Sequence, residues 1–171
     1  MAVISKAEAT RLLVAETARL PAAAGGCALC GLVLSTGALT VAEDAEAVVV
    51  VDGYARRRGH LLVVLRDHVE ELTALPWPRY AAMQRLAWEA SHALGKVLAP
   101  RRVYVAALGA PSALPTSFPH LHLHVVPLHH GDDRDRPANV FTFTGGVLRY
   151  QAGEGEALAA ELRAAWPSRS P

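Results

Sequence analysis

Three histidines alternate with apolar residues in one short segment, and this feature constrains the fold of the chain more than any other. The segment reads His-Leu-His-Leu-His-Val-Val from His120 to Val126. Strict alternation of this kind is typical of a β-strand with one buried face. The pattern therefore predicts a strand whose Leu121, Leu123 and Val125 point into a core. The three imidazoles are expected on the other face, about 6.5–7 Å apart, where they can surround one small anionic group.

The clustering of these imidazoles predicts a functional site. A single histidine on a strand is usually a surface residue or a hydrogen-bonded core residue. Three on one face cost desolvation and, when charged, mutual repulsion. Imidazole can act as nucleophile, acid, base or metal ligand near neutral pH, so a cluster of this kind is expected to carry chemistry.

Composition excludes several classes of protein. The chain has 171 residues, enough for one domain with a core. Although 51% of it is hydrophobic, no apolar run approaches the 18 or so residues that span a membrane. The first residues lack the charged and apolar regions of a signal peptide. A net charge of +1 argues against a nucleic-acid partner. We expect a cytoplasmic protein with neither a membrane nor a nucleic-acid partner.

The order of the expected elements indicates an α+β fold. Helices are expected over residues 5–20, after a Ser5 capping box, over 77–98 after Pro76, and over 154–166. Strands are expected at 31–34, 39–43, 47–52, 60–66, 102–108, 120–127 and 139–144. We predict a largely antiparallel sheet of about five strands, with a long helix between the last two core strands and with N- and C-terminal helices. Trp77 and Trp88 are expected to be core or helix-packing residues rather than a base-stacking platform, and Arg56–Arg58 to form a solvated loop or to contact outer phosphates.

Cys27 and Cys30 form a Cys-x-x-Cys pair. In a cytosolic chain such a pair indicates metal binding or redox chemistry rather than a structural disulfide. Without other ligands in view, two incidental cysteines remain an alternative.

The histidine segment, together with three upstream motifs, resembles the histidine-triad (HIT) family. The segment fits the pattern His-φ-His-φ-His-φ-φ, where φ is apolar, at every position. Upstream, the Cys-x-x-Cys pair looks like that of the zinc-containing branch, and Asp52, Gly59-His60 and Asp67-His68 match the family's spacings. The resemblance covers about residues 27–127, within a single HIT-like domain of residues 1–171. The helix over 5–20 and the extension over 128–171 lie outside it.

The resemblance implies a nucleotide hydrolase acting at the α-phosphorus of a purine nucleotide or nucleoside phosphoramidate. His122 would be the nucleophile that forms a nucleotidyl intermediate, with His124 beside the α-phosphate or the leaving group. The implied substrate-binding residues are His60, Asp52, Thr116 and Ser117. The family's glutamine before the triad is replaced by Thr116, and its asparagine falls at Gly109. These departures affect the expected leaving group more than the histidine chemistry.

The resemblance also implies a structural zinc ion and a homodimer. The zinc ligands would be Cys27, Cys30, His68 and His120, a closed set of two thiolates and two imidazoles. Pairing would use the long helix and an edge strand. The alternatives are a nucleotidyltransferase or phosphorylase of dinucleoside polyphosphates, and a nucleotide sensor with little turnover. A zinc hydrolase is a further alternative, but it needs an open coordination site and usually a carboxylate ligand.

Overall fold

The computed structural model describes residues 1–35, 37–109, 118–142 and 145–168. Within these ranges the strands form a five-stranded antiparallel sheet in the order β2-β3-β4-β6-β5 and a two-stranded sheet of β1 and β7. The strands are β1 (Ala2–Ile4), β2 (Thr40–Glu43), β3 (Ala47–Val51), β4 (Leu61–Leu65), β5 (Arg102–Ala106), β6 (His122–Leu128) and β7 (Val147–Arg149). The helices are α1 (Lys6–Thr17), α2 (Ala28–Leu34), α3 (Trp77–Leu98), α4 (Pro137–Phe141) and α5 (Glu154–Ala164), with short 3-10 turns at Ala22–Ala24, Leu72–Ala74 and Asp133–Asp135.

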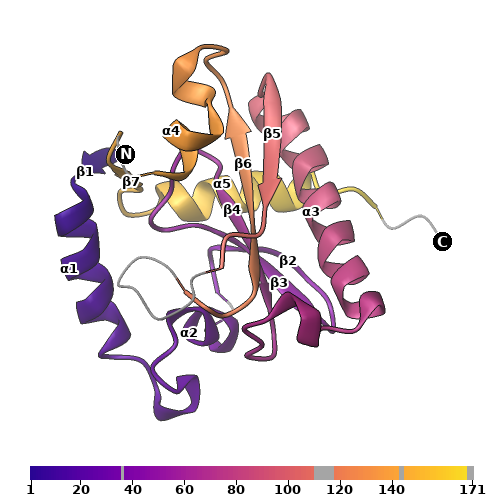
Figure 1. Cartoon of the computed structure of the whole chain (residues 1–171). Coiled ribbons are helices and arrows are strands. Elements are labelled where there is room, and N and C mark those ends of the chain that lie inside the picture. Colours follow the sequence, from indigo (N-terminus) through magenta and orange to yellow (C-terminus); the bar gives the residue numbers. More distant parts are fainter. Residues whose placement is uncertain (36, 110–117, 143–144, 169–171) are drawn as a thin grey trace.

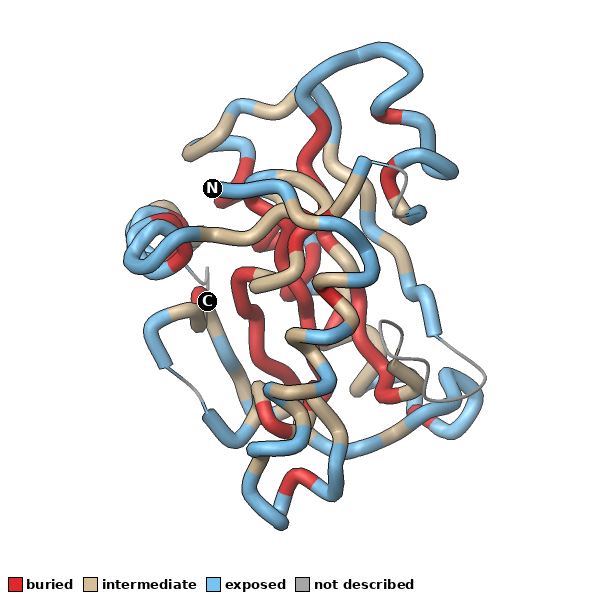
Figure 2. The backbone as a smooth tube through the Cα atoms, turned by 90° about the vertical axis from the view of Figure 1, so that its left-hand side faces the viewer, coloured by how far each residue is buried: buried red, intermediate tan, exposed pale blue. Residues whose placement is uncertain are grey.

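Two central strands of the sheet are buried along their whole length. Every residue of β3 and of β4 is buried, and Figure 2 shows this buried backbone at the centre of the molecule. Near-continuous apolar strands of this kind are expected where both faces of a sheet are covered. β6 pairs with β4 so that Val63 lies opposite Leu123 and Leu62 lies opposite His124. This register fixes the position of the histidine strand within the core.

The two faces of the sheet are covered by different elements. One face packs against α3 and α5 in a core that includes Val63, Met83, Leu94, Leu123 and Leu158. The opposite face carries a smaller cluster of Leu29 from α2 with β3 and β4 side chains. Figure 1 shows α1 and α3 on opposite sides of the sheet. The alternation of β6 therefore sends Leu123 and Val125 toward α3 and its two histidines toward the side of α1 and α2.

A short antiparallel pair of strands joins the start of the chain to the segment before α5. Val3 of β1 lies opposite Leu148 of β7, and the terminal ammonium of Met1 forms an ion pair with Glu154 at 2.6 Å. Ala55, in the loop between β3 and β4, bridges to Leu148. α1 follows β1 directly, and the hydroxyl of Ser5 accepts a hydrogen bond from the backbone N–H of Glu8, as the capping box predicts. These contacts hold α1 and β7 beside the loop that follows β3.

The predicted fold class is confirmed, with local corrections. The long helix lies between β4 and β5, one strand earlier in the chain than expected. Residues 31–34 belong to α2 and not to a strand, because the Cys27 thiol caps the backbone N–H of Cys30 and starts a helix. The strand expected at 139–144 is also wrong: Pro137 in the first turn starts α4, and residues 143–144 lie outside the described ranges.

The two tryptophans are not core residues, and they contact neighbouring rings along α3 instead, Trp77 with Tyr80 and Trp88 with His92. Trp77 is 72% exposed and Trp88 is 57% exposed, both on the outer side of α3. The inner side of α3 carries small residues and Met83, which fit closely against the sheet and leave no space for an indole. None of the helices in the described part of the chain combines the length and the apolar character needed to cross a lipid bilayer.

Candidate active site and metal site

Neighbouring histidines of the triad point to two different places. The Nε2 atom of His120 contacts the carbonyl oxygen of Leu65 at 2.8 Å, and its Nδ1 atom faces the two cysteine thiols. The Nδ1 atom of His122 instead contacts the carbonyl oxygen of His120 at 2.7 Å. A carbonyl only accepts, so this nitrogen donates, and Nε2 of His122 keeps its lone pair. The expectation that three rings surround one group is therefore wrong, because His120 precedes β6 and turns toward the thiols.

A continuous chain of contacts links His122 to a carboxylate. Nε2 of His122 lies 3.1 Å from Nε2 of His124, and Nδ1 of His124 lies 3.0 Å from Nε2 of His60. Nδ1 of His60 then lies 3.0 Å from Oδ2 of Asp52. The other Asp52 oxygen accepts the backbone N–H of Tyr54 at 2.8 Å. Asp52, His60, His122 and His124 thus come together, as the sequence predicts.

Gly59 sets the position of His60. Its φ is +88°, and a Cβ added there would lie 2.4 Å from a methyl carbon of Leu98 on α3. A side chain would therefore be strained by the backbone conformation and would collide with α3. The N–H of Gly59 donates to the hydroxyl of Tyr150 at 2.9 Å. Glycine lets the loop approach α3 closely enough for His60, which is fully buried, to reach His124.

Burial controls the protonation of this cluster. It lowers the pKa of His122, although the carbonyl of His120 acts in the opposite direction. Burial, and then the neighbouring His60, hold the pKa of His124 well below its usual range. Burial alone would raise the pKa of Asp52, but His60 and the N–H of Tyr54 outweigh it and lower that pKa. The arrangement therefore favours an anionic Asp52 and a neutral, nucleophilic ring at His122.

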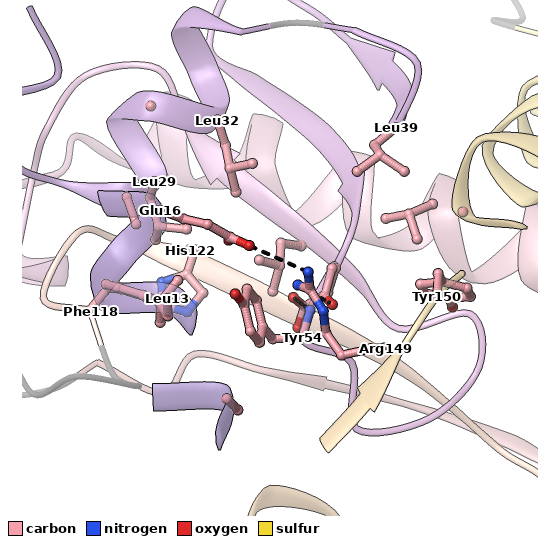
Figure 3. Close-up of a pocket in the computed structure, with 18 of the residues that line it drawn as sticks. Leu13, Glu16, Leu29, Leu32, Leu39, Tyr54, Phe118, His122, Arg149 and Tyr150 are labelled. Atoms are coloured by element: carbon pink, nitrogen blue, oxygen red, sulfur yellow. Dashed lines mark hydrogen bonds and ion pairs between the residues drawn. The ribbon is translucent and has the colours of Figure 1, made fainter. Parts of the chain in front are cut away.

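His122, His124 and Asp52 line one cavity of about 650 Å³. This volume is typical of a small-molecule site. Figure 3 shows apolar side chains from α1, α2 and the loop before β6 around it, among them Leu13, Leu29, Leu32 and Phe118. Thr116 and Ser117, which the sequence assigns to substrate binding, lie outside the described residues.

The arginine loop behaves differently from the solvated loop that the sequence favours. Arg56 lines the cavity, and burial lowers its pKa. Arg57 donates to the carbonyl oxygen of Arg134 at 2.5 Å, while Arg58 is exposed. Only Arg56 of the three is therefore placed beside the nucleotide-sized cavity.

A second cluster, of two thiols and two imidazoles, lies on the Nδ1 side of the His120 ring. One donor atom from each of Cys27, Cys30, His68 and His120 lies within 4.8 Å of the others. The Cys27 thiol lies 3.5 Å from Nδ1 of His120, and the Cys30 thiol lies 3.3 Å from Nδ1 of His68 and 3.4 Å from Nδ1 of His120. Ligands about 2.0–2.3 Å from a tetrahedral zinc ion lie about 3.3–3.8 Å apart. The cluster therefore fits a structural zinc ion, as the resemblance to the HIT family implies.

The two imidazoles of this cluster are oriented by their outer nitrogens. Nε2 of His68 lies 3.1 Å from a carboxylate oxygen of Glu70, and Nε2 of His120 contacts the carbonyl of Leu65. Both contacts place the proton on Nε2 and leave the Nδ1 lone pair toward the thiols. Contacts of this kind commonly fix the tautomer of histidines that bind zinc.

Sequence reasoning missed several polar residues of the cavity, three of which contact one another. Glu16 of α1, Tyr54 after β3 and Arg149 of β7 all line it (Figure 3). Their separation in the chain gives no spacing signal, because the β1–β7 pairing that brings them together involves strands of only three residues. Of these three residues, only Tyr54 lies close in sequence to a predicted site residue, two positions after Asp52.

Comparison with known proteins agrees with the resemblance to the HIT family. The HIT domain profile matches residues 36–131. A protein named as an uncharacterised HIT-like protein of Mycobacterium tuberculosis is 27% identical over 146 residues, 78% of this chain and 97% of that protein. A crystal structure of a zinc-bound histidine triad family protein from Mycobacterium smegmatis superposes with a TM-score of 0.63 at 28% identity, over 83% of this chain and 94% of that one. A histidine triad nucleotide-binding protein of Sulfolobus tokodaii shares the fold, with a TM-score of 0.63 at 20% identity, over 81% and 91% of the two chains.

The chain belongs to the HIT domain family. Its cluster of two cysteines and two histidines identifies the zinc-containing branch of that family. Membership supports a nucleotide-binding or hydrolase activity in general terms.

Proposed function

We propose that this protein hydrolyses a nucleotide or nucleoside phosphoramidate at the α-phosphorus, through a nucleotidyl intermediate on His122. The observation that carries the proposal is the 2.7 Å contact between Nδ1 of His122 and the carbonyl of His120. It holds the proton on Nδ1 and leaves the Nε2 lone pair at the cavity, beside His124. An imidazole fixed in this tautomer is an activated nucleophile.

The reaction proceeds in two displacements. Nε2 of His122 attacks the α-phosphorus, the bond from phosphorus to the leaving group breaks, and the leaving group takes a proton from Nε2 of His124. A water molecule then attacks the phosphorus and gives a proton to His124. The phosphorus–nitrogen bond breaks, its electron pair returns to His122, and a nucleoside monophosphate is released. Dividing the reaction in this way replaces one difficult step with two easier ones.

The contacts behind His122 support His124 as the source of the proton that the leaving group needs. Nε2 of His122 keeps its lone pair, so the 3.1 Å contact between the two rings needs its proton on Nε2 of His124. Nδ1 of His124 then accepts from Nε2 of His60 at 3.0 Å. Nδ1 of His60 contacts Asp52 and the backbone N–H of Arg56, so this loop orients His60 and, through it, the ring of His124.

The remaining substrate contacts are proposed from the family resemblance. Asp52 can also accept hydrogen bonds from ribose hydroxyls, because a carboxylate offers about four acceptor sites and two contacts occupy it here. Ser117 and Thr116 would donate to phosphate oxygens. We treat the whole chain as one domain, since α1 and β7 line the same cavity as the triad.

We further propose that Cys27, Cys30, His68 and His120 hold one structural zinc ion. When bound, the ion joins the start of α2, the segment after β4 and the segment before β6. Four protein ligands close the coordination sphere, so the triad's chemistry stays with His122 and His124. Cysteines placed as metal ligands agree with a reducing compartment, and the proposed location is the cytoplasm.

A second copy of the chain is the proposed partner. β5 is an edge strand of the sheet, and Val105 on it is 42% exposed. Trp77 and Trp88 are the exposed indoles of α3, the helix that precedes β5. Exposed aromatic side chains and an unpaired strand edge are typical of an interaction surface. Light scattering should give about twice the chain mass of 18.2 kDa, and Trp88→Glu should shift the protein toward the monomer.

A turnover assay in ¹⁸O-labelled water tests the function and separates its alternatives. Adenosine 5′-phosphoramidate should yield adenosine monophosphate with one ¹⁸O atom on phosphorus. A phosphorylase supplied with inorganic phosphate would instead give adenosine diphosphate from its substrate. Binding without any release of monophosphate would identify a sensor and would contradict the proposed hydrolysis.

A further inference from the structure

The cavity has a wall that lies outside the segment matched by the HIT profile. That segment covers residues 36–131, yet α1 contributes several lining residues and β7 with the start of α5 contributes several more. Glu16 and Arg149 are the charged residues of this wall that contact each other (Figure 3). Residues outside the matched segment therefore line the same cavity as the histidines.

Arg149 is tethered to the loop that carries Asp52. One of its guanidinium nitrogens donates to the carbonyl oxygen of Gly53 at 3.1 Å, and its central carbon lies 4.1 Å from the centre of the Tyr54 ring. The other terminal nitrogen lies 3.4 Å from Oε1 of Glu16. Stacking on an aromatic ring and a fixed carbonyl contact hold the guanidinium in one place. Arg149 thereby positions the carboxylate of Glu16 at the cavity.

The carboxylate of Glu16 remains available to a ligand. The hydroxyl of Tyr54 is buried. Burial, and then a hydrogen bond to the side chain of Glu16, raise the pKa of Tyr54, so the hydroxyl stays neutral and faces this carboxylate. Arg149 contacts one of the two carboxylate oxygens of Glu16, at a length that marks a weak pair. The side chain of Glu16 is 49% exposed and a carboxylate offers about four acceptor sites, so part of its accepting capacity stays open to a ligand in the cavity.

The position of the cluster indicates which part of a nucleotide it meets. Asp52, the residue proposed for ribose, is followed directly by Gly53 and Tyr54. The proposed function places the α-phosphate at His122 and His124, which line the same cavity as Asp52. In a nucleotide the ribose lies between the phosphate and the base. The cluster is therefore placed for the base, between the apolar side chains of the cavity.

We propose that Glu16, held by Arg149 and Tyr54, reads the base and selects guanine over adenine. Guanine presents adjacent donors at N1–H and the 2-amino group, which match the two oxygens of a carboxylate. Adenine presents an unprotonated N1 at the same place, which a carboxylate cannot satisfy because it only accepts. The inference rests on the proposed function, since it assigns the base to a nucleotide held at His122.

Equilibrium binding of three monophosphates tests this assignment. Isothermal titration calorimetry should show guanosine monophosphate binding about tenfold more tightly than adenosine monophosphate, the scale of one bidentate contact. Inosine monophosphate, which keeps N1–H but lacks the 2-amino group, should fall between them. Glu16→Gln should reduce the difference to within about twofold, because the amide offers only one acceptor. Glu8→Gln is the matched control, since Glu8 is on the same helix, pairs with Arg11 and lies outside the cavity lining.

The possible results separate this inference from the proposed function. Equal affinity for the guanine and adenine nucleotides in the natural chain would overturn the guanine assignment alone. A preference that survives in Glu16→Gln would also overturn it, because Glu16 would not be its source. Failure of all three nucleotides to bind would overturn the proposed function, and the base assignment with it. Circular dichroism of both variants establishes that each is folded.

Discussion

His120 and His122 are two residues apart, yet their rings serve different sites. A backbone carbonyl contacts Nε2 of His120, so its Nδ1 faces two thiols. A backbone carbonyl contacts Nδ1 of His122, so its Nε2 faces the cavity and His124. The same side chain therefore presents opposite nitrogens in the two clusters. The carbonyl partner of each ring, rather than the ring itself, therefore decides which nitrogen faces the metal cluster in His120 and which faces the cavity, where catalysis is proposed, in His122.

The two clusters also differ in their charge partners. The metal cluster contains two thiols, whose ionised forms need a cation. The cavity cluster contains one carboxylate, Asp52, at the end of a chain of three imidazoles. Substitutions in the metal cluster should therefore reduce stability and metal content, whereas substitutions in the cavity cluster should reduce turnover.

The largest expected effect is the loss of turnover in His122→Ala. Removing the nucleophile should lower kcat by at least about a thousandfold, or about 4 kcal/mol. The matched control is His129→Ala, which removes an exposed imidazole just beyond β6 and should leave kcat unchanged. Steady-state release of nucleoside monophosphate measures both variants. Near-normal turnover of His122→Ala would show that His122 is not the nucleophile, and would contradict the different roles proposed for His120 and His122.

Removal of one thiol should act on stability first. Cys30→Ala is expected to lower bound zinc from about one equivalent to under a tenth, and to lower the free energy of unfolding by more than about 3 kcal/mol. Metal analysis and urea unfolding measure the two effects. Glu70→Gln keeps all four donors and alters only the contact to His68, so it should weaken zinc binding by about tenfold. Zinc-free natural protein with intact thiols would contradict the assignment.

The sequence predicts the histidine clusters better than the walls around them. The periodicity of residues 120–126 predicts β6 and its buried leucines, because a period of two residues fixes which side chains share a face. The periodicity alone does not show that His120 turns away, since that depends on thiols 90 residues distant. The family resemblance, which assigns His120 to the zinc ligands, does imply it. Likewise the contact of Glu16 with Arg149 spans 133 residues. The short apolar run in α2 fits helix or strand equally, and the thiol cap decides between them.

The identity of the substrate's leaving group should change turnover less than the loss of His122 does. The family's glutamine and asparagine are absent at Thr116 and Gly109, so a long polyphosphate would lack two charge-assisted hydrogen bonds. At about 1.5–3 kcal/mol each, these losses should lower kcat/KM for diadenosine tetraphosphate by a hundredfold or more relative to adenosine phosphoramidate. Equal values for the two substrates would show that another cation replaces these donors. Arg56, which lines the cavity, is then the first residue to substitute.

The smallest effect is a shift in the acid limb of the pH profile. Burial lowers the pKa of His122, and the ring is nucleophilic only when Nε2 is unprotonated. Activity should therefore be present above that lowered pKa and be lost as the pH falls through it. The limb of kcat/KM, which reports the free enzyme, should have its midpoint below the usual histidine value of about 6.5. A midpoint at or above that value would contradict the buried environment of His122.

Native mass spectrometry tests the division between the two histidines most directly, because one spectrum reports both clusters. The protein is mixed with adenosine phosphoramidate, and the reaction is quenched before turnover is complete. The natural chain should carry one zinc ion and one adenylyl group, and peptide mapping should place the adenylyl group on His122. His122→Ala should keep the zinc ion and form no adduct. An adduct on His120, or loss of zinc from His122→Ala, would contradict the account.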